Sequence, residues 1–324
     1  VGKAYYNIGL GYFALEEFQN AVDEFISAVG AFNSLRSFLK SEDNWKISFR
    51  AQNERAYVML WSSLLKIGKI DDALFAAEHG RAQSLSDKLL IQYNLPSSLS
   101  AATIDTKETI SRLLRELSTP IIFLGIEGPT INISFLRRGK KIVFRQGRLE
   151  CDGEDQHATR VLLETALEVI GAKVRCEDRT FGKLENEYPS VRKVARGKVG
   201  NRSLPPSDDP FKPLYDAVIS PIIDMLGPQD DELVIVPEGV LCLTPWAAVI
   251  QSIRIRTAPS LTSYQLISSL PEGHHKKTGA LLVGNPCFAQ LRNPLPALLC
   301  AQKEVEMIAS ILNTRDRKST RLNS

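Results

Sequence analysis

The sequence predicts a multidomain protein in which all-α helical repeats precede an α/β domain. Two observations carry this prediction. Apolar residues recur every three to four positions over residues 1 to about 90, which is the period of amphipathic helices. Beyond Pro120 the period shortens to two, and strand-like and helical segments then alternate along the chain.

Composition places the chain among ordinary globular proteins. Its 324 residues are enough for about two domains. Hydrophobic residues make up 44% and charged residues 24%, values that exclude a mainly disordered or collagen-like chain. The richest apolar stretch, 233–250, is interrupted by two prolines and Glu238, so it predicts no membrane-spanning helix. The net charge of +3 gives no case for nucleic-acid binding, and we expect a cytoplasmic protein with neither nucleic acid nor membrane as a partner.

The cysteines and histidines show no metal-site spacing. An odd number of cysteines fits a reducing compartment better than a disulfide framework, and we expect no metal or other cofactor. Cys242 stands between two leucines and is predicted to be a small buried side chain. A reactive pair of Cys287 with the upstream His274 or His275 is a minor alternative. The five cysteines are Cys151, Cys176, Cys242, Cys287 and Cys300.

Two copies of a helical hairpin occupy the first part of the chain. The second copy is offset from Ala21 to Ala73, and the longer interval predicts an extra helical insertion around 32–50. Gly68 is expected to end a helix in the left-handed conformation, and Asp71 and Asp72 suit the start of the next helix. The pattern of the first copy consists of Tyr5, Ile8, Gly9, Tyr12, Ala21, Phe25 and Ala28.

This pattern resembles the tetratricopeptide repeat. Repeat helices bury both faces only when neighbours stack on them, so the segment is interpreted as the C-terminal end of a longer array. The resemblance implies a concave groove that binds a protein or peptide, and it places Tyr6, Asn7, Leu10 and Phe13 on the groove. The alternative is that these four side chains pack against a preceding repeat.

Turn-forming residues at 94–100 mark the domain boundary. We therefore predict the helical array over 1–94, a linker over 95–110 and the α/β domain over 111–314. A short helix over 106–117 leads into a strand at 121–126 and a hairpin that turns at 138–140, followed by a helix over 158–170. The polar, basic stretch 181–209 is predicted to be a mobile insertion.

The second half of the α/β domain has sharper signals. An apolar helical stripe runs from Leu214 to Leu226, and Pro221 should bend it or restart it. Residues 233–236 are continuously apolar, as in a strand buried on both faces. A loop and short helix follow at 243–249, and Ser260 is expected to cap a helix. A second buried strand is predicted at 279–286 and a helix at 304–312.

The order of these motifs resembles the CHAT domain, a caspase-like relative of cysteine peptidases found after tetratricopeptide repeats. The likeness rests on L-V-I-V-P-E-G-V-L at 233–241, L-T-P-W-A-A at 243–248, A-P-S-L at 258–261 and L-L-V-G-N-P at 281–286. The resemblance implies a Cys–His dyad on later core strands, and no His-Gly pair follows Gly284. We therefore assign no catalytic residue and expect an incomplete α/β caspase-like domain. Residues 316–324 resemble a translated sequencing adapter, so 315–324 are expected to be a non-native tail.

Three functional hypotheses follow. The first is a protein-interaction repeat array fused to a caspase-like cysteine peptidase domain, in which residues 1–324 themselves lack the catalytic dyad. The alternative is a non-enzymatic scaffold whose CHAT part is a docking module. Nucleotide binding is disfavoured, because neither Gly239 nor Gly284 continues into a dinucleotide-binding or P-loop pattern.

Overall fold

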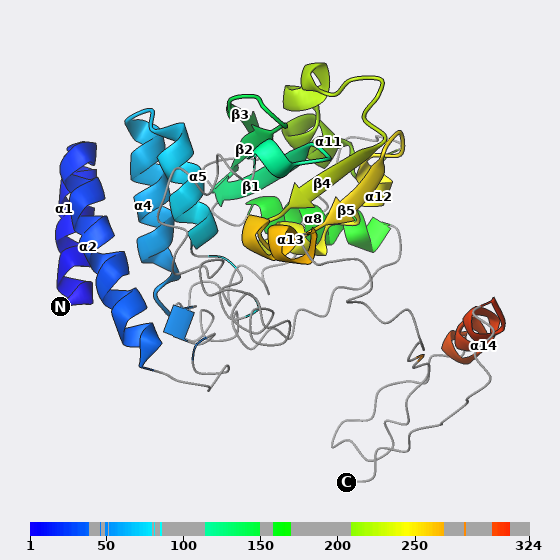
Figure 1. Ribbon diagram of the computed structural model, residues 1–324, viewed down its shortest axis with the longest axis horizontal. Coiled ribbons are helices and arrows are strands. Elements are labelled where there is room, and N and C mark those ends of the chain that lie inside the picture. Colours follow the sequence, from blue (N-terminus) through cyan, green and yellow to red (C-terminus); the bar gives the residue numbers. More distant parts are fainter. Residues whose placement is uncertain are drawn as a thin grey trace, which may run out of the picture. The chain divides into compact units, whose positions relative to one another are not determined.

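The computed structural model describes residues 1–38, 46, 49–50, 52–79, 81, 85, 114–149, 158–169, 209–268, 282 and 300–311 (Figure 1). The chain divides into two units, Val1–Ser269 and Leu270–Ser324. In the second unit, α14 (Ala301–Ile311) confirms the helix predicted at 304–312. The linker at 95–110, the tail at 315–324, most of the insertion at 181–209 and most of the strand at 279–286 lie outside the described residues.

Two helical hairpins begin the first unit. Gly9 allows the helices of the first hairpin to approach closely, because a Cβ atom there would lie 2.7 Å from the Phe25 ring. Gly68 joins the helices of the second hairpin with a φ of +74°, and Asp71 and Asp72 occupy the first turn of the next helix, as predicted. The four helices are α1 (Gly2–Ala14), α2 (Phe18–Ser37), α4 (Glu54–Lys66) and α5 (Ile70–His79).

A five-stranded mixed sheet in the order β3-β2-β1-β4-β5 forms the rest of this unit. The first three strands are an antiparallel meander, and β1, β4 and β5 run parallel. Ile121 of β1 lies opposite Val234 of β4. The strands are β1 (Ile121–Glu127), β2 (Thr130–Leu136), β3 (Val143–Arg148), β4 (Glu232–Val236) and β5 (Arg254–Thr257).

Helices cover both faces of this sheet. Successive side chains of a strand point to opposite faces, so Ile122 and Leu124 of β1 enter one core and Ile121 and Phe123 enter another. The first core lies against α8 (Ala158–Val169), α11 (Lys212–Val218), the 3-10 helix η3 (Ser220–Met225), η4 (Gly239–Leu243) and α12 (Trp246–Val249). The second core contains Leu74 of α5 and Leu261 of α13 (Leu261–Ser268).

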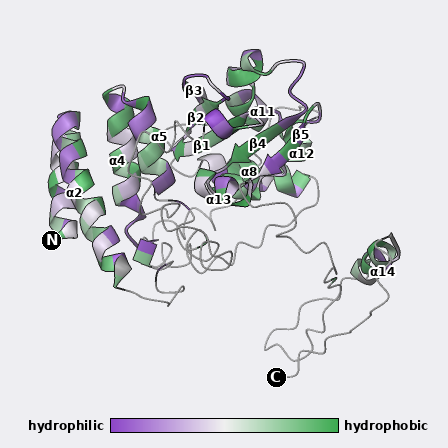
Figure 2. Cartoon of the chain, in the orientation of Figure 1, coloured by the Kyte–Doolittle hydropathy of each residue, from purple (hydrophilic) through white to green (hydrophobic). Residues whose placement is uncertain are grey.

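The strand at 233–236 is buried on both faces, as its continuous apolar sequence predicted. Leu233, Val234, Ile235 and Val236 are all fully buried, and β4 is coloured as hydrophobic in Figure 2. The helix predicted at 158–170 is confirmed as α8. The stripe around Pro221 breaks into α11 and η3, which confirms the predicted restart.

One strand was missed by the sequence interpretation. β5 is four residues long, and its Arg254 and Arg256 side chains are exposed and pair with Asp231 and Glu232. A short strand at the edge of a sheet needs no apolar run, so it leaves only a weak alternation in the sequence.

Gly147 of β3 provides a stability test. A Cβ atom at this position would lie 1.6 Å from the backbone oxygen of Ala217 in α11, so the helix must move away when any side chain is added. We expect Gly147→Ala to lower the free energy of unfolding by about 3 kcal/mol. Gly30→Ala on the exposed surface of α2, where no atom lies within 4 Å, should instead raise it by up to about 1 kcal/mol. Urea unfolding measures both values, and equal effects would contradict the close approach.

Candidate functional site

The carboxyl ends of β1 and β4 meet the helical hairpins at one edge of the sheet. In open α/β sheets, ligands commonly bind just beyond the carboxyl ends of the parallel strands. In this protein that edge is contacted by Arg81, which lies two positions after the last residue of α5. We call Glu78, Arg81 and Glu238, together with the groups they bond, the junction.

Arg81 binds β1 at its middle and β4 at its carboxyl end. Its Nη2 donates to the backbone oxygen of Leu124 in β1, and its Nη1 donates to those of Val236 and Pro237 at 3.3 and 3.4 Å. The guanidinium also stacks 3.8 Å from the centre of the Phe123 ring. Because a guanidinium is planar and carries several donors, one side chain satisfies carbonyl groups of two neighbouring strands.

Glu238 fixes the turn that follows β4. Its Oε2 lies 3.4 Å from Arg81 Nη2 and accepts a hydrogen bond of 2.8 Å from the backbone N–H of Ile126. The next residue, Gly239, has a φ of +52°, a conformation that glycine adopts without strain. This turn is therefore held both to Ile126 of β1 and to Arg81.

Glu78 is a buried carboxyl that caps a helix far away in the sequence. Its oxygens accept hydrogen bonds from the backbone N–H groups of Leu261 and Thr262, at 2.9 and 2.8 Å, and from Thr262 Oγ1 at 2.7 Å. These groups lie in the first turn of α13, where free N–H donors and the helix dipole favour an acceptor. Ser260 also caps this helix, accepting from Ser263 N–H at 3.0 Å as predicted.

Burial and hydrogen bonding act in opposite directions on Glu78. Burial raises the pKa of its carboxyl, while the bonds from Thr262 and Leu261 and the charge of Arg81 lower it in part. The net effect is a pKa above the usual value for glutamate. The carboxyl of Glu78 is therefore more readily protonated in the folded protein than a glutamate side chain is in water.

A chain of polar side chains links three helices beside the junction. Tyr57 of α4 donates to Asn33 Oδ1 of α2 at 2.6 Å, and Asn33 Nδ2 lies 2.7 Å from His79 Nε2 at the end of α5. The guanidinium of Arg50 stacks on the Tyr57 ring at 3.9 Å. His79 is thus part of the packing between the hairpins.

Cys242 differs from its prediction. It was expected to be buried, but the 3-10 helix η4 turns Leu241 into the core and leaves Cys242 exposed. Its Sγ lies 3.7 Å from the backbone oxygen of Pro237, and burial around the sulfur raises the pKa of the thiol. A thiol with a raised pKa carries little thiolate at neutral pH, so it is a poor nucleophile. Cys151, Cys176 and Cys287 lie outside the described residues.

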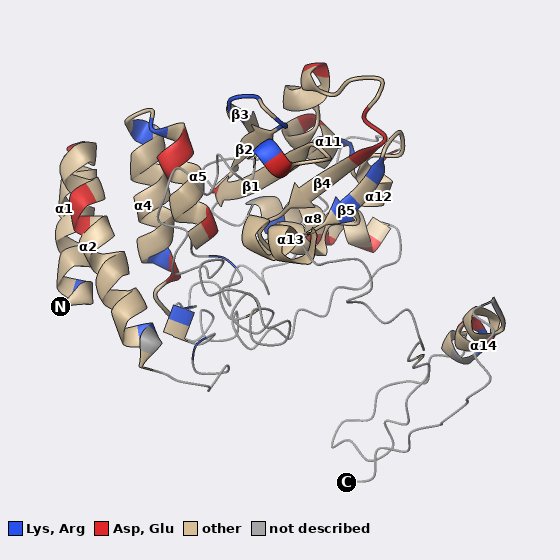
Figure 3. Ribbon diagram, in the orientation of Figure 1, with Lys and Arg blue, Asp and Glu red and all other residues tan. Residues whose placement is uncertain are grey.

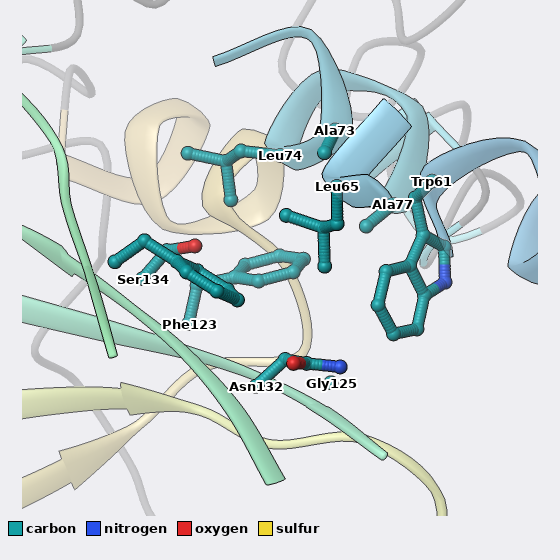
Figure 4. Close-up of a pocket in the computed structure, with 10 residues that line it drawn as sticks. Trp61, Leu65, Ala73, Leu74, Ala77, Phe123, Gly125, Asn132 and Ser134 are labelled. Atoms are coloured by element: carbon teal, nitrogen blue, oxygen red, sulfur yellow. The ribbon is translucent and has the colours of Figure 1, made fainter. Parts of the chain in front are cut away.

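A small crevice lies between the second hairpin and the sheet (Figure 4). Trp61, Leu65 and Phe123 form apolar walls, and Asn132 forms part of the floor. The cavity measures about 20 Å³, which is room for about one water molecule and too little for a metabolite. Asn132 Oδ1 accepts from Gln146 at 2.7 Å, whereas its buried Nδ2 has no hydrogen-bond partner among the described residues.

The four predicted groove residues all lie on α1 but in different surroundings. The Tyr6 ring is 6.0 Å from that of Phe25, and the Phe13 ring is 5.3 Å from that of Phe18. Leu10 is half-buried against the same cluster as Tyr6 and Phe13, and Asn7 is exposed. Asn7 is therefore the most accessible of the four to a partner.

The described residues offer neither a metal site nor a membrane span. No group of three or more His, Cys, Asp or Glu side chains gathers among them in a way that could hold a metal ion. Within the same residues, every helix is too short or too polar to cross a bilayer.

The sequence profile of the CHAT domain matches residues 208–323. This CHAT segment begins just before α11, contains β4, β5 and α13, and continues through α14. The mixed sheet flanked by helices is consistent with an α/β CHAT domain. The match starts later than the predicted boundary at 111, so β1–β3 and α8 lie outside it.

No family profile identifies the helical hairpins, and the comparison with curated proteins found no match. The assignment of the hairpins to tetratricopeptide repeats stays a prediction. Glu78 and Arg81 come before the CHAT segment in sequence, yet both bind elements inside it. Sequence reasoning missed these contacts, since their partners lie more than 150 residues away.

Replacing Arg81 tests how much the junction contributes to stability. A lysine retains the charge but not the planar set of donors, so carbonyl groups of Leu124 in β1 and Val236 in β4 lose their partners. We expect Arg81→Lys to lower the free energy of unfolding by about 2–4 kcal/mol. The matched change Arg254→Lys, at an exposed ion pair, should alter it by less than about 1 kcal/mol. Urea denaturation of both variants makes the comparison, and similar losses would argue against a special role for Arg81.

Glu78→Gln tests the raised pKa of the buried carboxyl. The amide nitrogen would face N–H donors, and we expect a loss of about 2–3 kcal/mol in unfolding free energy. A raised pKa in the folded state makes the wild type lose stability as pH rises from about 4.5 through that pKa, whereas Gln does not titrate. The amount by which the unfolding free energy of the wild type exceeds that of Glu78→Gln should therefore increase as pH falls from about 7 to 4.5.

Unfolding free energies measured across this pH range show whether the pKa of Glu78 is raised or lowered. The exposed Glu168→Gln on α8 is the matched control and should stay within about 0.5 kcal/mol of the wild type. A gap that narrows on acidification would mean that the hydrogen bonds outweigh burial and that the pKa is lowered.

Proposed function

We propose that this chain combines a protein-binding array of helical hairpins with a CHAT domain of a caspase-like cysteine peptidase, and that residues 1–324 bind a partner without carrying the catalytic dyad. The match at 208–323 supports the CHAT part of this proposal. The hairpins support the binding part, since stacked helical hairpins present extended surfaces to protein partners.

The observation that carries the proposal is the direct packing of α5 on the sheet. Leu74 of α5 shares a core with Phe123 of β1 and Val236 of β4. A partner that moves the second hairpin therefore acts on the strands themselves. Such contact gives a binding array a physical route to influence the domain that follows it.

A scaffold without enzymatic activity is the second candidate, and the junction favours it. In related architectures the carboxyl edge of the parallel strands is where ligands bind. Here Arg81 fills that edge between β1 and β4 and bonds their carbonyl oxygens. The CHAT part would then serve as a docking module.

Peptide selection tests the binding proposal. Peptides of random sequence displayed on phage are selected on the purified chain, and Asn7→Arg on the exposed side of α1 should weaken the selected peptides at least about tenfold. Ser27→Arg, at an exposed position of α2, is the matched control and should leave their affinity unchanged. Equal losses in both variants, or no loss in either, would remove Asn7 and its neighbours Tyr6, Leu10 and Phe13 from the proposed groove.

Incubation of the chain with a random peptide library, read by mass spectrometry, tests the absence of the dyad. We expect no cleavage by residues 1–324. Cleavage that disappears in Cys242→Ala would place a nucleophile inside this chain and overturn that part of the proposal. A longer form of the protein that cuts a bound partner favours the peptidase, and one that binds the partner and leaves it intact favours the scaffold.

A further inference from the structure

The outer edge of β3 pairs with no backbone among the residues that the structure describes, and within the strand Arg145 Nη1 donates to the Phe144 carbonyl oxygen at 3.1 Å. The strand pairs with β2 on one side only and ends the order β3-β2-β1-β4-β5. No other backbone of the described chain pairs with Val143–Arg148. An edge strand of this kind presents a row of N–H and C=O groups that can pair with a further strand.

Exposed positive charges surround this edge. Figure 3 shows the basic residues of the turn between β2 and β3, and two more follow within β3. Nearby acids already have partners: Asp216 of α11 is bonded to Lys212 at 2.9 Å, and Asp230 is bonded to Arg137. The exposed basic side chains are Arg138, Lys140, Lys141, Arg145 and Arg148.

The spacing of the two arginines places charge on both faces of the strand. Arg145 and Arg148 are three positions apart, and side chains alternate between faces, so they point to opposite sides of the sheet. A strand added to the edge would thus meet one guanidinium on each of its faces. Opposite charges directly across neighbouring strands stabilise their pairing.

We propose that the outer edge of β3 binds an extended acidic segment of a partner protein by strand addition. Backbone hydrogen bonds along the edge supply affinity, and the five basic side chains select for acidic residues. The surface belongs to the sheet and contains none of the groove residues on α1. If strand addition at β3 is disproved, the proposed binding by the hairpins still stands. If binding by the hairpins is disproved, strand addition at β3 still stands.

Charge and shape favour this occupant over two others. A second copy of β3 would bring its own arginines against Arg145 and Arg148, and like charges across a strand pair are destabilising. Single-stranded nucleic acid is bound by basic grooves with exposed aromatic rings for stacking. The one aromatic ring of β3, Phe144, is half-buried and lines the crevice beneath the second hairpin.

A short acidic peptide tests the proposal on the whole chain. The probe is the capped, fluorescently labelled peptide Thr-Glu-Val-Thr-Glu-Val, whose glutamates share the three-residue spacing of the two arginines. We expect binding by fluorescence anisotropy at low ionic strength, weakened by salt. The double variant Arg145→Glu, Arg148→Glu should bind about tenfold more weakly or worse, since each cross-strand charge pair is worth up to about fivefold.

The matched control reverses two arginines of the opposite edge strand. Arg254→Glu, Arg256→Glu in β5 changes the net charge equally and should leave peptide affinity within about twofold, because β5 is not the proposed site. Two further peptides test the backbone hydrogen bonds: one is N-methylated on the odd-numbered residues and the other on the even-numbered residues. One of the two should fail to bind, because its methyl groups replace the N–H groups that would face β3.

Amide hydrogen exchange on the wild type provides a readout that depends on no variant folding. Peptide binding should slow exchange within Val143–Arg148. The proposal fails if neither N-methylated peptide loses affinity, if the amides of β3 are not protected, or if the peptide does not bind. It also fails if a thymidine oligonucleotide binds more tightly than the peptide and the Arg145→Glu, Arg148→Glu variant loses that binding.

Discussion

The structure depends on one constraint, which is that the two charged residues at the end of α5 must find partners in the sheet domain. Glu78 and Arg81 are three positions apart in the sequence, and both side chains are largely removed from water. Burying either group without a partner is costly. The N-terminus of α13 provides donors to Glu78, while Glu238 and backbone oxygens of β1 and β4 provide partners to Arg81. The position of the second hairpin is therefore set by electrostatics as much as by apolar packing.

This constraint changes how the domains are understood. The sequence suggested an array and an α/β domain separated by a linker at 95–110. In the structure the second hairpin forms one layer of the sheet domain, because Leu74 and Leu261 cover the same face. The helices up to α13 therefore belong to one compact unit, Val1–Ser269. The CHAT segment at 208–323 receives part of its framework from residues that the family profile does not cover.

The sequence predicted the features that depend on neighbours along the chain. Gly68, Ser260, the buried strand β4 and the break at Pro221 all follow from local rules of turns, caps and periodicity. The rest depends on contacts across long separations. The cap that Glu78 makes on α13, the bonds of Arg81 and the outward position of Cys242 leave no local pattern. β5 was not predicted because its exposed arginines give a polar sequence of the kind found in loops.

The cap on α13 has a consequence for synthesis of the protein. Glu78 is 183 positions from Leu261 and 184 positions from Thr262, whose backbone N–H groups donate hydrogen bonds to it. While the ribosome is still producing the intervening chain, this carboxylate has no donor to meet and must stay hydrated. The second hairpin can make this bond only after α13 has been synthesised, which delays closure of the core that contains Leu74 and Leu261.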